Sequence, residues 1–147
     1  MKKLIYLLVI LVAMSFTIPW QPSFAKATQQ AKASQKHILL NFSGSDWCGP
    51  CIRLHKEIFD TKVFLDMADS NLLMVNADFP RNKKNKPSKV IQAQNAQLAE
   101  RYNPQGKFPF TLLLDENGKI VKVWDGLPEM KASAFAAEVS KICSFKK

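Results

Sequence analysis

A pair of cysteines two residues apart constrains this 147-residue chain more than any other feature. The pair lies in GSDWCGPCIRLHKEIFD, residues 44–60, soon after the apolar run HILLNF at 37–42. The run is typical of a buried strand, and from Pro50 onward apolar side chains recur at helical spacing. The sequence therefore predicts that Cys48 lies in the loop between a strand and a helix, with Cys51 one helical turn further on.

Two cysteines at this spacing can bind a metal, attach a haem or exchange electrons as a dithiol. A structural zinc site needs four ligands, and the chain has one Cys-x-x-Cys and only one further cysteine, Cys143. Haem attachment needs a histidine directly after the second cysteine, where this chain has Ile52. The residue types therefore favour redox chemistry, with no metal and no cofactor.

The redox interpretation gives the two cysteines different roles. Disulfide exchange requires a thiolate, and the unpaired N–H groups and partial positive charge of a helix N-terminus stabilise one at Cys48. Pro50 suits the first helical turn, Gly49 keeps the approach to the sulfur open, and Trp47 offers a flat apolar surface beside it. Cys51 falls on the inner, apolar face of the helix. We therefore expect an exposed Cys48 to attack a partner and Cys51 to resolve the mixed disulfide.

The rest of the chain alternates strand and helix signals. Strand patterns, the last two joined by the hairpin signal ENG, cover residues 37–42, 72–78, 110–115 and 119–126. Helical spacing covers a segment from Pro50 to Ile58 and residues 62–71, 89–102 and 130–145. The order β-α-β-α-β-β-α predicts an α/β fold with a mixed four-stranded sheet and helices on both faces.

The string WCGPC after a strand, within this order of elements, resembles the thioredoxin family over roughly residues 37–145. The longer string FSGSDWCGPC is similar to exported thioredoxin-like proteins, which include the periplasmic domains of membrane thiol reductases. The resemblance implies a thioredoxin fold and a redox-active disulfide between Cys48 and Cys51. It also implies that Phe108-Pro109 is a cis peptide bond facing the dithiol. A proline there has no N–H, which leaves the neighbouring backbone free to pair with an extended substrate.

Two features depart from the family pattern. The family carries a buried aspartate in the strand before the cysteines, and the matching residue here is Asn41, which cannot accept a proton from the second cysteine. Water and Glu57 are the alternatives for that step. The basic loop, residues 79–89, contains five basic residues and is longer than a thioredoxin needs, either as a docking surface or as a solvated insertion. His55 is interpreted as a helix-flank histidine and Cys143 as a buried apolar side chain.

The first 25 residues have the three-part pattern of a secretory signal. MKK gives a positive start, LIYLLVILVAMSF is uncharged, and SFA ends with small residues at the spacing of a signal peptidase site. The sequence predicts a signal peptide at 1–25 cut after Ala25, a flexible or helical lead-in at 26–36, and a thioredoxin-like domain at 37–147. A retained membrane anchor is the alternative, although the apolar run is short for a span of about 20 residues.

The net charge of the chain and the residues around its cysteines indicate which partners it has and whether it reduces or oxidises them. Cleavage lowers the formal charge from +9 to +7, because the leader holds two lysines and no acidic residue. An exported protein rarely meets nucleic acid, so we expect none, and we expect a periplasmic or extracellular monomer whose substrates are protein cysteines. Gly49 and Pro50 bring no charge to the sulfur, which favours a reductase supplied by a membrane-borne thiol donor. The alternatives are a disulfide-donating oxidase and a non-catalytic docking or redox-sensing module.

Overall fold

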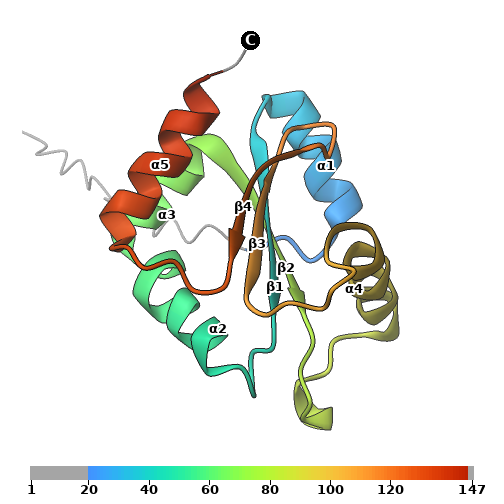
Figure 1. Cartoon of the computed structure of the whole chain (residues 1–147). Coiled ribbons are helices and arrows are strands. Elements are labelled where there is room, and N and C mark those ends of the chain that lie inside the picture. Colours follow the sequence, from blue (N-terminus) through green and yellow to red (C-terminus); the bar gives the residue numbers. More distant parts are fainter. Residues whose placement is uncertain (1–19, 146–147) are drawn as a thin grey trace, which may run out of the picture.

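The computed structural model describes residues 20–145 of the chain. One sheet lies between two layers of helices (Figure 1). The predicted fold class, a mixed four-stranded sheet with helices on both faces, is therefore confirmed. Most of the predicted signal peptide, residues 1–19, lies outside the described residues.

The sheet has a parallel half and an antiparallel half. Its strands are β1 (His37–Ser43), β2 (Leu72–Asp78), β3 (Phe110–Leu114) and β4 (Ile120–Asp125). They lie in the order β2-β1-β3-β4, with β1 parallel to β2, β1 antiparallel to β3, and β3 antiparallel to β4. All seven residues of the central β1 are buried, because helices cover both of its faces. This burial explains why apolar residues on both faces make up most of its sequence.

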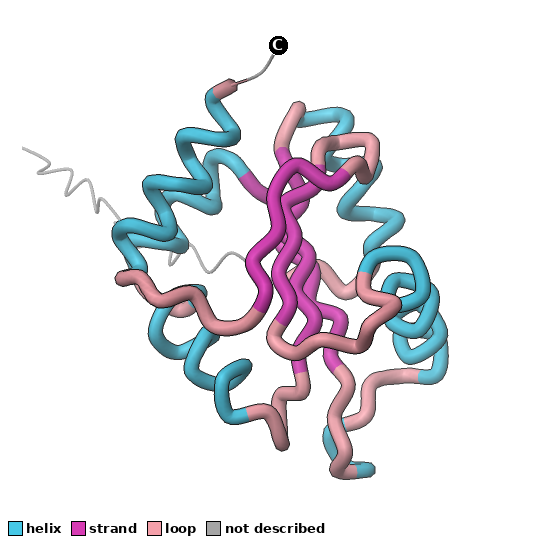
Figure 2. The backbone as a smooth tube through the Cα atoms, in the orientation of Figure 1, coloured by secondary structure: helices cyan, strands magenta, loops and turns pink. Residues whose placement is uncertain are grey.

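The helices divide between the two faces of the sheet (Figures 1 and 2). One face carries α1 (Phe24–Ser34) and α4 (Lys89–Tyr102), and the other carries α2 (Gly49–Leu54), α3 (Lys62–Asn71) and α5 (Ala132–Ser144). A π-helical turn, η1 (His55–Phe59), continues α2, and a short 3-10 turn, η2 (Lys83–Asn85), lies in the basic loop. The stretch expected as a flexible or helical lead-in is largely α1. Among the helices of residues 20–145, none has the length and apolar character needed to span a membrane.

Alternation along β1 assigns its side chains to two separate cores. Ile38, Leu40 and Phe42 pack in the core under α1 and α4, whereas Leu39 packs in the core under α2, α3 and α5. Asn41 and Ser43 continue the Leu39 face by the same alternation, and both are fully buried. The sheet therefore presents polar groups to the helix layer at the end of β1, directly before the cysteine loop.

The segment that precedes α1 packs against the domain. The ring of Trp20 lies 5.2 Å from the ring of His55 and 5.5 Å from that of Phe59, measured between ring centroids. Ser23 caps α1, because its hydroxyl accepts a hydrogen bond from a backbone N–H of the first turn. The predicted cut after Ala25 would thus fall inside the first turn of this helix. The position of the cut stays a prediction.

Candidate active site

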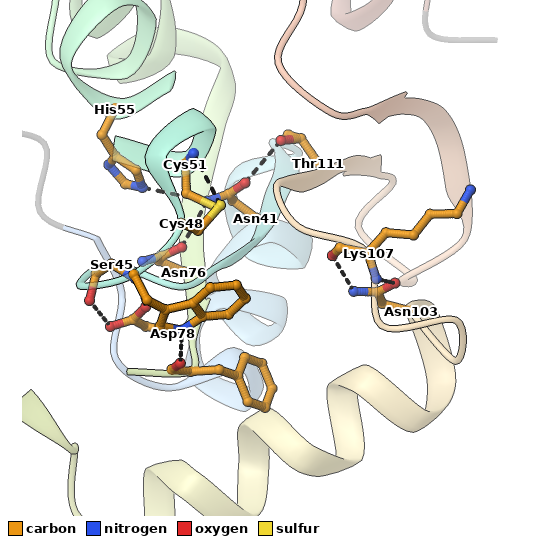
Figure 3. Close-up of a disulfide and its surroundings, with 12 residues drawn as sticks. Asn41, Ser45, Cys48, Cys51, His55, Asn76, Asp78, Asn103, Lys107 and Thr111 are labelled. Carbon is orange, nitrogen blue, oxygen red and sulfur yellow. Dashed lines mark hydrogen bonds between the residues drawn. A yellow bond between two sulfur atoms is a disulfide. The ribbon is translucent and has the colours of Figure 1, made fainter. Parts of the chain in front are cut away.

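Cys48 and Cys51 form a disulfide at the N-terminus of α2, with the sulfur atoms 2.11 Å apart (Figure 3). Cys48 is the N-cap residue, and its Sγ accepts a hydrogen bond from the Cys51 N–H at 3.3 Å. Pro50 lies in the first turn, where a missing N–H leaves no helical hydrogen bond unmade. The predicted placement of the pair between a strand and a helix is confirmed.

Cys48 is less exposed than the sequence predicts. Only 5% of its surface is accessible in the disulfide form, and Cys51 is fully buried. The expectation of an exposed Cys48 was wrong because its side chain folds back over the first turn of the helix that it caps. Gly49 and Pro50 are exposed beside it, and no atom lies within 4 Å of the place where a Cβ of Gly49 would stand. The approach to the disulfide therefore passes over these two residues.

An aromatic cluster lies beside the cysteine loop. The Trp47 Nε1–H donates to the carbonyl oxygen of Phe79 at 2.8 Å, and the Trp47 ring meets the ring of Phe108 edge-on at 5.4 Å. The guanidinium of Arg81 lies 4.1 Å from the centre of the Trp47 ring. Gly44 makes room for this ring, since a Cβ there would stand 2.3 Å from it. The sequence identified Trp47 and Phe108 but missed Phe79 and Arg81, which belong to a loop without a recognisable motif.

The Phe108-Pro109 peptide bond is cis, as the resemblance to the thioredoxin family implies. These two residues and Pro50 line one surface groove of about 580 Å³, together with the loop from Gly126 to Met130. The backbone of Pro109 is fixed to that loop, because its carbonyl oxygen accepts the N–H of Gly126 at 3.0 Å. The structure thus brings Phe108 and Pro109 to one groove with Pro50, which lies between the two cysteines, although almost 60 residues of sequence separate them.

The basic loop is tied to the cysteine loop by one carboxylate. Asp46 accepts hydrogen bonds from the backbone N–H groups of Arg81 and Asn82, both at 2.9 Å, and from the side chain of Asn85 at 3.0 Å. The hydrogen bond from Arg81 is the main reason why the pKa of Asp46 lies below its ordinary 3.8. Residues 79–89 are therefore held against the candidate site. No sequence signal singled out Asp46.

A row of polar side chains crosses three strands beside Cys51 (Figure 3). Asn41 of β1 is in register with Asn76 of β2 and with Thr111 of β3. The Asn41 amide donates to the Asn76 side-chain oxygen at 2.9 Å and accepts from the Thr111 hydroxyl at 3.0 Å. Its nitrogen also lies 3.4 Å from Nε2 of His55. The position where the resemblance implies a carboxylate thus holds a neutral, hydrogen-bonded amide.

His55 takes part in this row rather than flanking the helix. Its backbone N–H donates to the carbonyl oxygen of Cys51, which places it one helical turn after that residue. Burial lowers the pKa of His55 below its ordinary 6.5, and the negative charges of Asp60 and Asp78 offset part of this effect. The interpretation of His55 as a helix-flank residue was therefore wrong. Its ring turns inward because Asn41 offers it a hydrogen bond from the sheet.

Other predicted residues lie away from this row. Glu57 is exposed and forms an ion pair with Arg53 at 2.8 Å, and both side chains line the groove beside Pro109. Glu57 is therefore poorly placed to take a proton from Cys51. Cys143 is buried in the core under α5, as expected for an apolar side chain. Within residues 20–145, no three His, Cys, Asp or Glu side chains gather as metal ligands would.

Comparisons with known proteins identify several to which this chain is similar. Residues 24–142 match the family model of the thioredoxin-like domain. The disulfide bond reductase DsbH of Chlamydia pneumoniae is 36% identical over 102 residues, which cover 69% of this chain and 59% of that protein. The thioredoxin-related protein DsbJ of the same organism is 26% identical over 109 residues, which cover 74% of this chain and 31% of that protein.

A solved structure of a DsbH oxidoreductase superposes with a TM-score of 0.79 at 28% identity. The superposition covers 88% of this chain and 87% of that one. The match covers only 59% of DsbH and 31% of DsbJ, so a large part of each of these relatives lies outside the matched region.

Proposed function

Since this chain belongs to the thioredoxin-like domain family, we propose that it is an exported thiol–disulfide oxidoreductase that reduces disulfides in other proteins. The Cys48–Cys51 disulfide at the start of α2 carries the proposal. The Cys51 N–H points at the Cys48 sulfur, and the helix N-terminus adds a partial positive charge there. Both stabilise a thiolate, the form of cysteine that attacks a disulfide.

The proposed reaction has two steps. The Cys48 thiolate attacks one sulfur of the substrate disulfide, forms a mixed disulfide and releases the first substrate thiolate. The Cys51 thiolate then attacks the Cys48 sulfur, closes the intramolecular disulfide and releases the second substrate thiolate. The cysteine pair gives up two electrons and the substrate disulfide takes both. The burial of Cys51 beside Cys48 supports this order of attack.

The groove beside Pro109 is the proposed place for the substrate chain. It begins at Pro50, next to the disulfide, and runs along Phe108 and Pro109. The Trp47 ring packs edge-on against Phe108, one of the residues that line the groove. An open groove lined by both apolar and charged side chains fits an extended polypeptide that carries a disulfide rather than one defined small molecule.

Two observations support the reductase direction. Gly49 and Pro50 bring no charge to the sulfur, so the helix start is the main stabiliser of the thiolate and the pair stays a good reductant. The relative DsbH is named a disulfide bond reductase. Exported compartments are oxidising. We therefore propose that a membrane-borne thiol donor returns the pair to the reduced form.

Export is proposed from the leader at residues 1–25, and the structure bears on where that leader ends. A cut after Ala25 would remove both Trp20, which packs on His55, and Ser23, which caps α1. These contacts favour the other interpretation, in which the chain before Ala25 stays attached to the domain. N-terminal sequencing of the protein isolated from its host distinguishes the two.

Reduction of insulin by dithiothreitol tests the proposed activity. We expect the protein to accelerate insulin precipitation, Cys48→Ser to abolish the effect, and Cys51→Ser to accumulate mixed disulfides that cannot be resolved. Unaccelerated precipitation would contradict the activity. Equilibration with glutathione buffers tests whether the protein acts as a reductase or as an oxidase. A potential of about −250 mV or lower supports the reductase, and one near about −120 mV contradicts it in favour of a disulfide-donating oxidase.

A further inference from the structure

A cavity of about 270 Å³ lies beside Cys51, on a different face of α2 from the proposed substrate groove. Its lining includes Ser43 and Asn76 from the sheet and Cys51 and His55 from the helix. The Ser43 hydroxyl is fully buried and has no hydrogen-bond partner among residues 20–145. A pocket of this size can hold water where polar groups line it, and Ser43, Asn76 and His55 are suitable partners for that water.

His55 is directed toward the turn that contains Cys51. Side chains four residues apart lie on one face of a helix, and helical side chains lean toward the N-terminus. The π-helical turn begins at His55, and turns of this kind are frequent at functional sites. The rings of Trp20 and Phe59, with centroids 5.2 and 5.3 Å away, hold the imidazole in place from the other side.

The hydrogen bonds define which His55 nitrogen is a base. The side-chain oxygen of Asn41 already accepts from Thr111, and its nitrogen can only donate, so Nε2 of His55 presents a lone pair to it. At 3.4 Å this contact is long, and the lone pair is only weakly engaged. The imidazole is therefore poised to accept a proton at Nε2 with little loss of bonding.

Burial keeps the imidazole neutral near pH 7, against the pull of the charges around it. Lys56 of η1 lines the same cavity, Asp60 follows at the end of the π-helical turn, and Asp78 ends β2. Burial is the largest influence on the pKa of His55 and lowers it, while Asp60 and Asp78 act in the opposite sense. A neutral imidazole is the form that takes up a proton.

We propose that His55 accepts the proton of Cys51, directly or through a water molecule in the cavity, when Cys51 resolves the mixed disulfide. This inference rests on the proposed function and deepens its second step. The Cys51 S–H bond breaks and its proton goes to Nε2, and the thiolate forms a bond to the Cys48 sulfur. The bond between Cys48 and the substrate sulfur breaks, and the substrate leaves with the electron pair. His55 then returns the proton to the departing thiolate or to solvent.

Release of thionitrobenzoate from dithio-bis-nitrobenzoate tests this role. The reduced full-length protein should release two equivalents in sequence, the first by attack of Cys48 and the second by attack of Cys51 on the mixed disulfide. His55→Gln keeps an oxygen that can accept from Asn41 but removes the base. We expect an unchanged first phase and a second phase slowed about 10-fold or more near neutral pH. The difference should shrink above about pH 9, where thiols ionise unaided.

A matched control is His37→Gln, the same exchange at the opposite end of β1, for which we expect both phases to be unchanged. A second phase in His55→Gln that equals the wild type, or an equal slowing of both phases, overturns the role of His55. If the wild-type protein releases neither equivalent of thionitrobenzoate, the proposed function itself is refuted.

If His55→Gln does not fold, the pH dependence of the second phase in the wild-type protein tests the inference instead. A second-phase rate that falls as NMR shows His55 taking up its proton supports the inference. A second-phase rate whose pH dependence follows thiol ionisation alone overturns the inference.

Discussion

A chain that begins at Lys26 should be markedly less stable than one that begins at Trp20. The shorter chain loses the half-buried Trp20 ring, for which about 2 kcal/mol is a moderate value for a large apolar side chain. It loses the Ser23 cap of α1, typically about 1 kcal/mol. It also loses the hydrogen bond from the Gln21 N–H to the Met74 carbonyl, about 1 kcal/mol. These three losses sum to about 4 kcal/mol, and the loss of Phe24, whose ring packs beside Tyr102, adds to them; the total is a large part of the 5–15 kcal/mol of a typical domain.

Urea unfolding of the two chains, followed by circular dichroism, measures this difference. Trp20→Ala in the longer chain is the matched control and should account for half of the loss at most, since it removes the ring and keeps both the cap and Phe24. Equal unfolding midpoints for the chains that begin at Trp20 and Lys26 would refute the reasoning. They would show that residues 20–25 pack without contributing to stability, and a cut after Ala25 would then be harmless.

Three further predictions concern the surroundings of the cysteines. Gly44→Ala should push the Trp47 ring aside and lower the free energy of unfolding by about 1–3 kcal/mol, with a change in tryptophan fluorescence as the direct readout. Asp46→Asn should loosen the basic loop, and hydrogen exchange at the Arg81 amide should become faster than in the wild type. Because the pKa of His55 is lowered in the folded state, the unfolded state binds more protons below about pH 6.5, so stability should fall as the pH drops from neutral toward 5. The loss should be smaller in His55→Gln, as urea unfolding at several pH values would show; an identical pH dependence would contradict the assignment.

The sequence predicts the fold well because the signals for its elements are local. The strand at 72–78 and the helices at 62–71 and 89–102 have the expected bounds, each marked by its own apolar period and flanking turn residues. The placement of Cys48 and Cys51 also follows locally, since the motif itself joins a strand to a helix start.

The polar half of the site has no such local signal. Asn41, Asn76 and Thr111 come from segments up to 70 residues apart, and only the register of three strands brings them into contact. Asn76 and Thr111 are ordinary strand residues when considered alone, and only the family resemblance singles out Asn41. The inward turn of His55 depends on that row and on the π-helical turn, neither of which apolar spacing reveals. The same holds for Phe79, whose contacts with Trp47 and Phe108 are set by the path of the basic loop.

The two faces of α2 have different surroundings. The N-terminal segment packs on the face that carries His55. Pro50 lies on the open groove, where a partner chain can approach, while Cys51 and His55 line the cavity next to the sheet. Trp20 covers the imidazole from outside, and burial is the main cause of its lowered pKa. Removal of Trp20 by a cut after Ala25 would expose the ring and bring its pKa back toward the ordinary 6.5. Where the leader ends therefore affects the proposed proton acceptor as well as the stability of the fold.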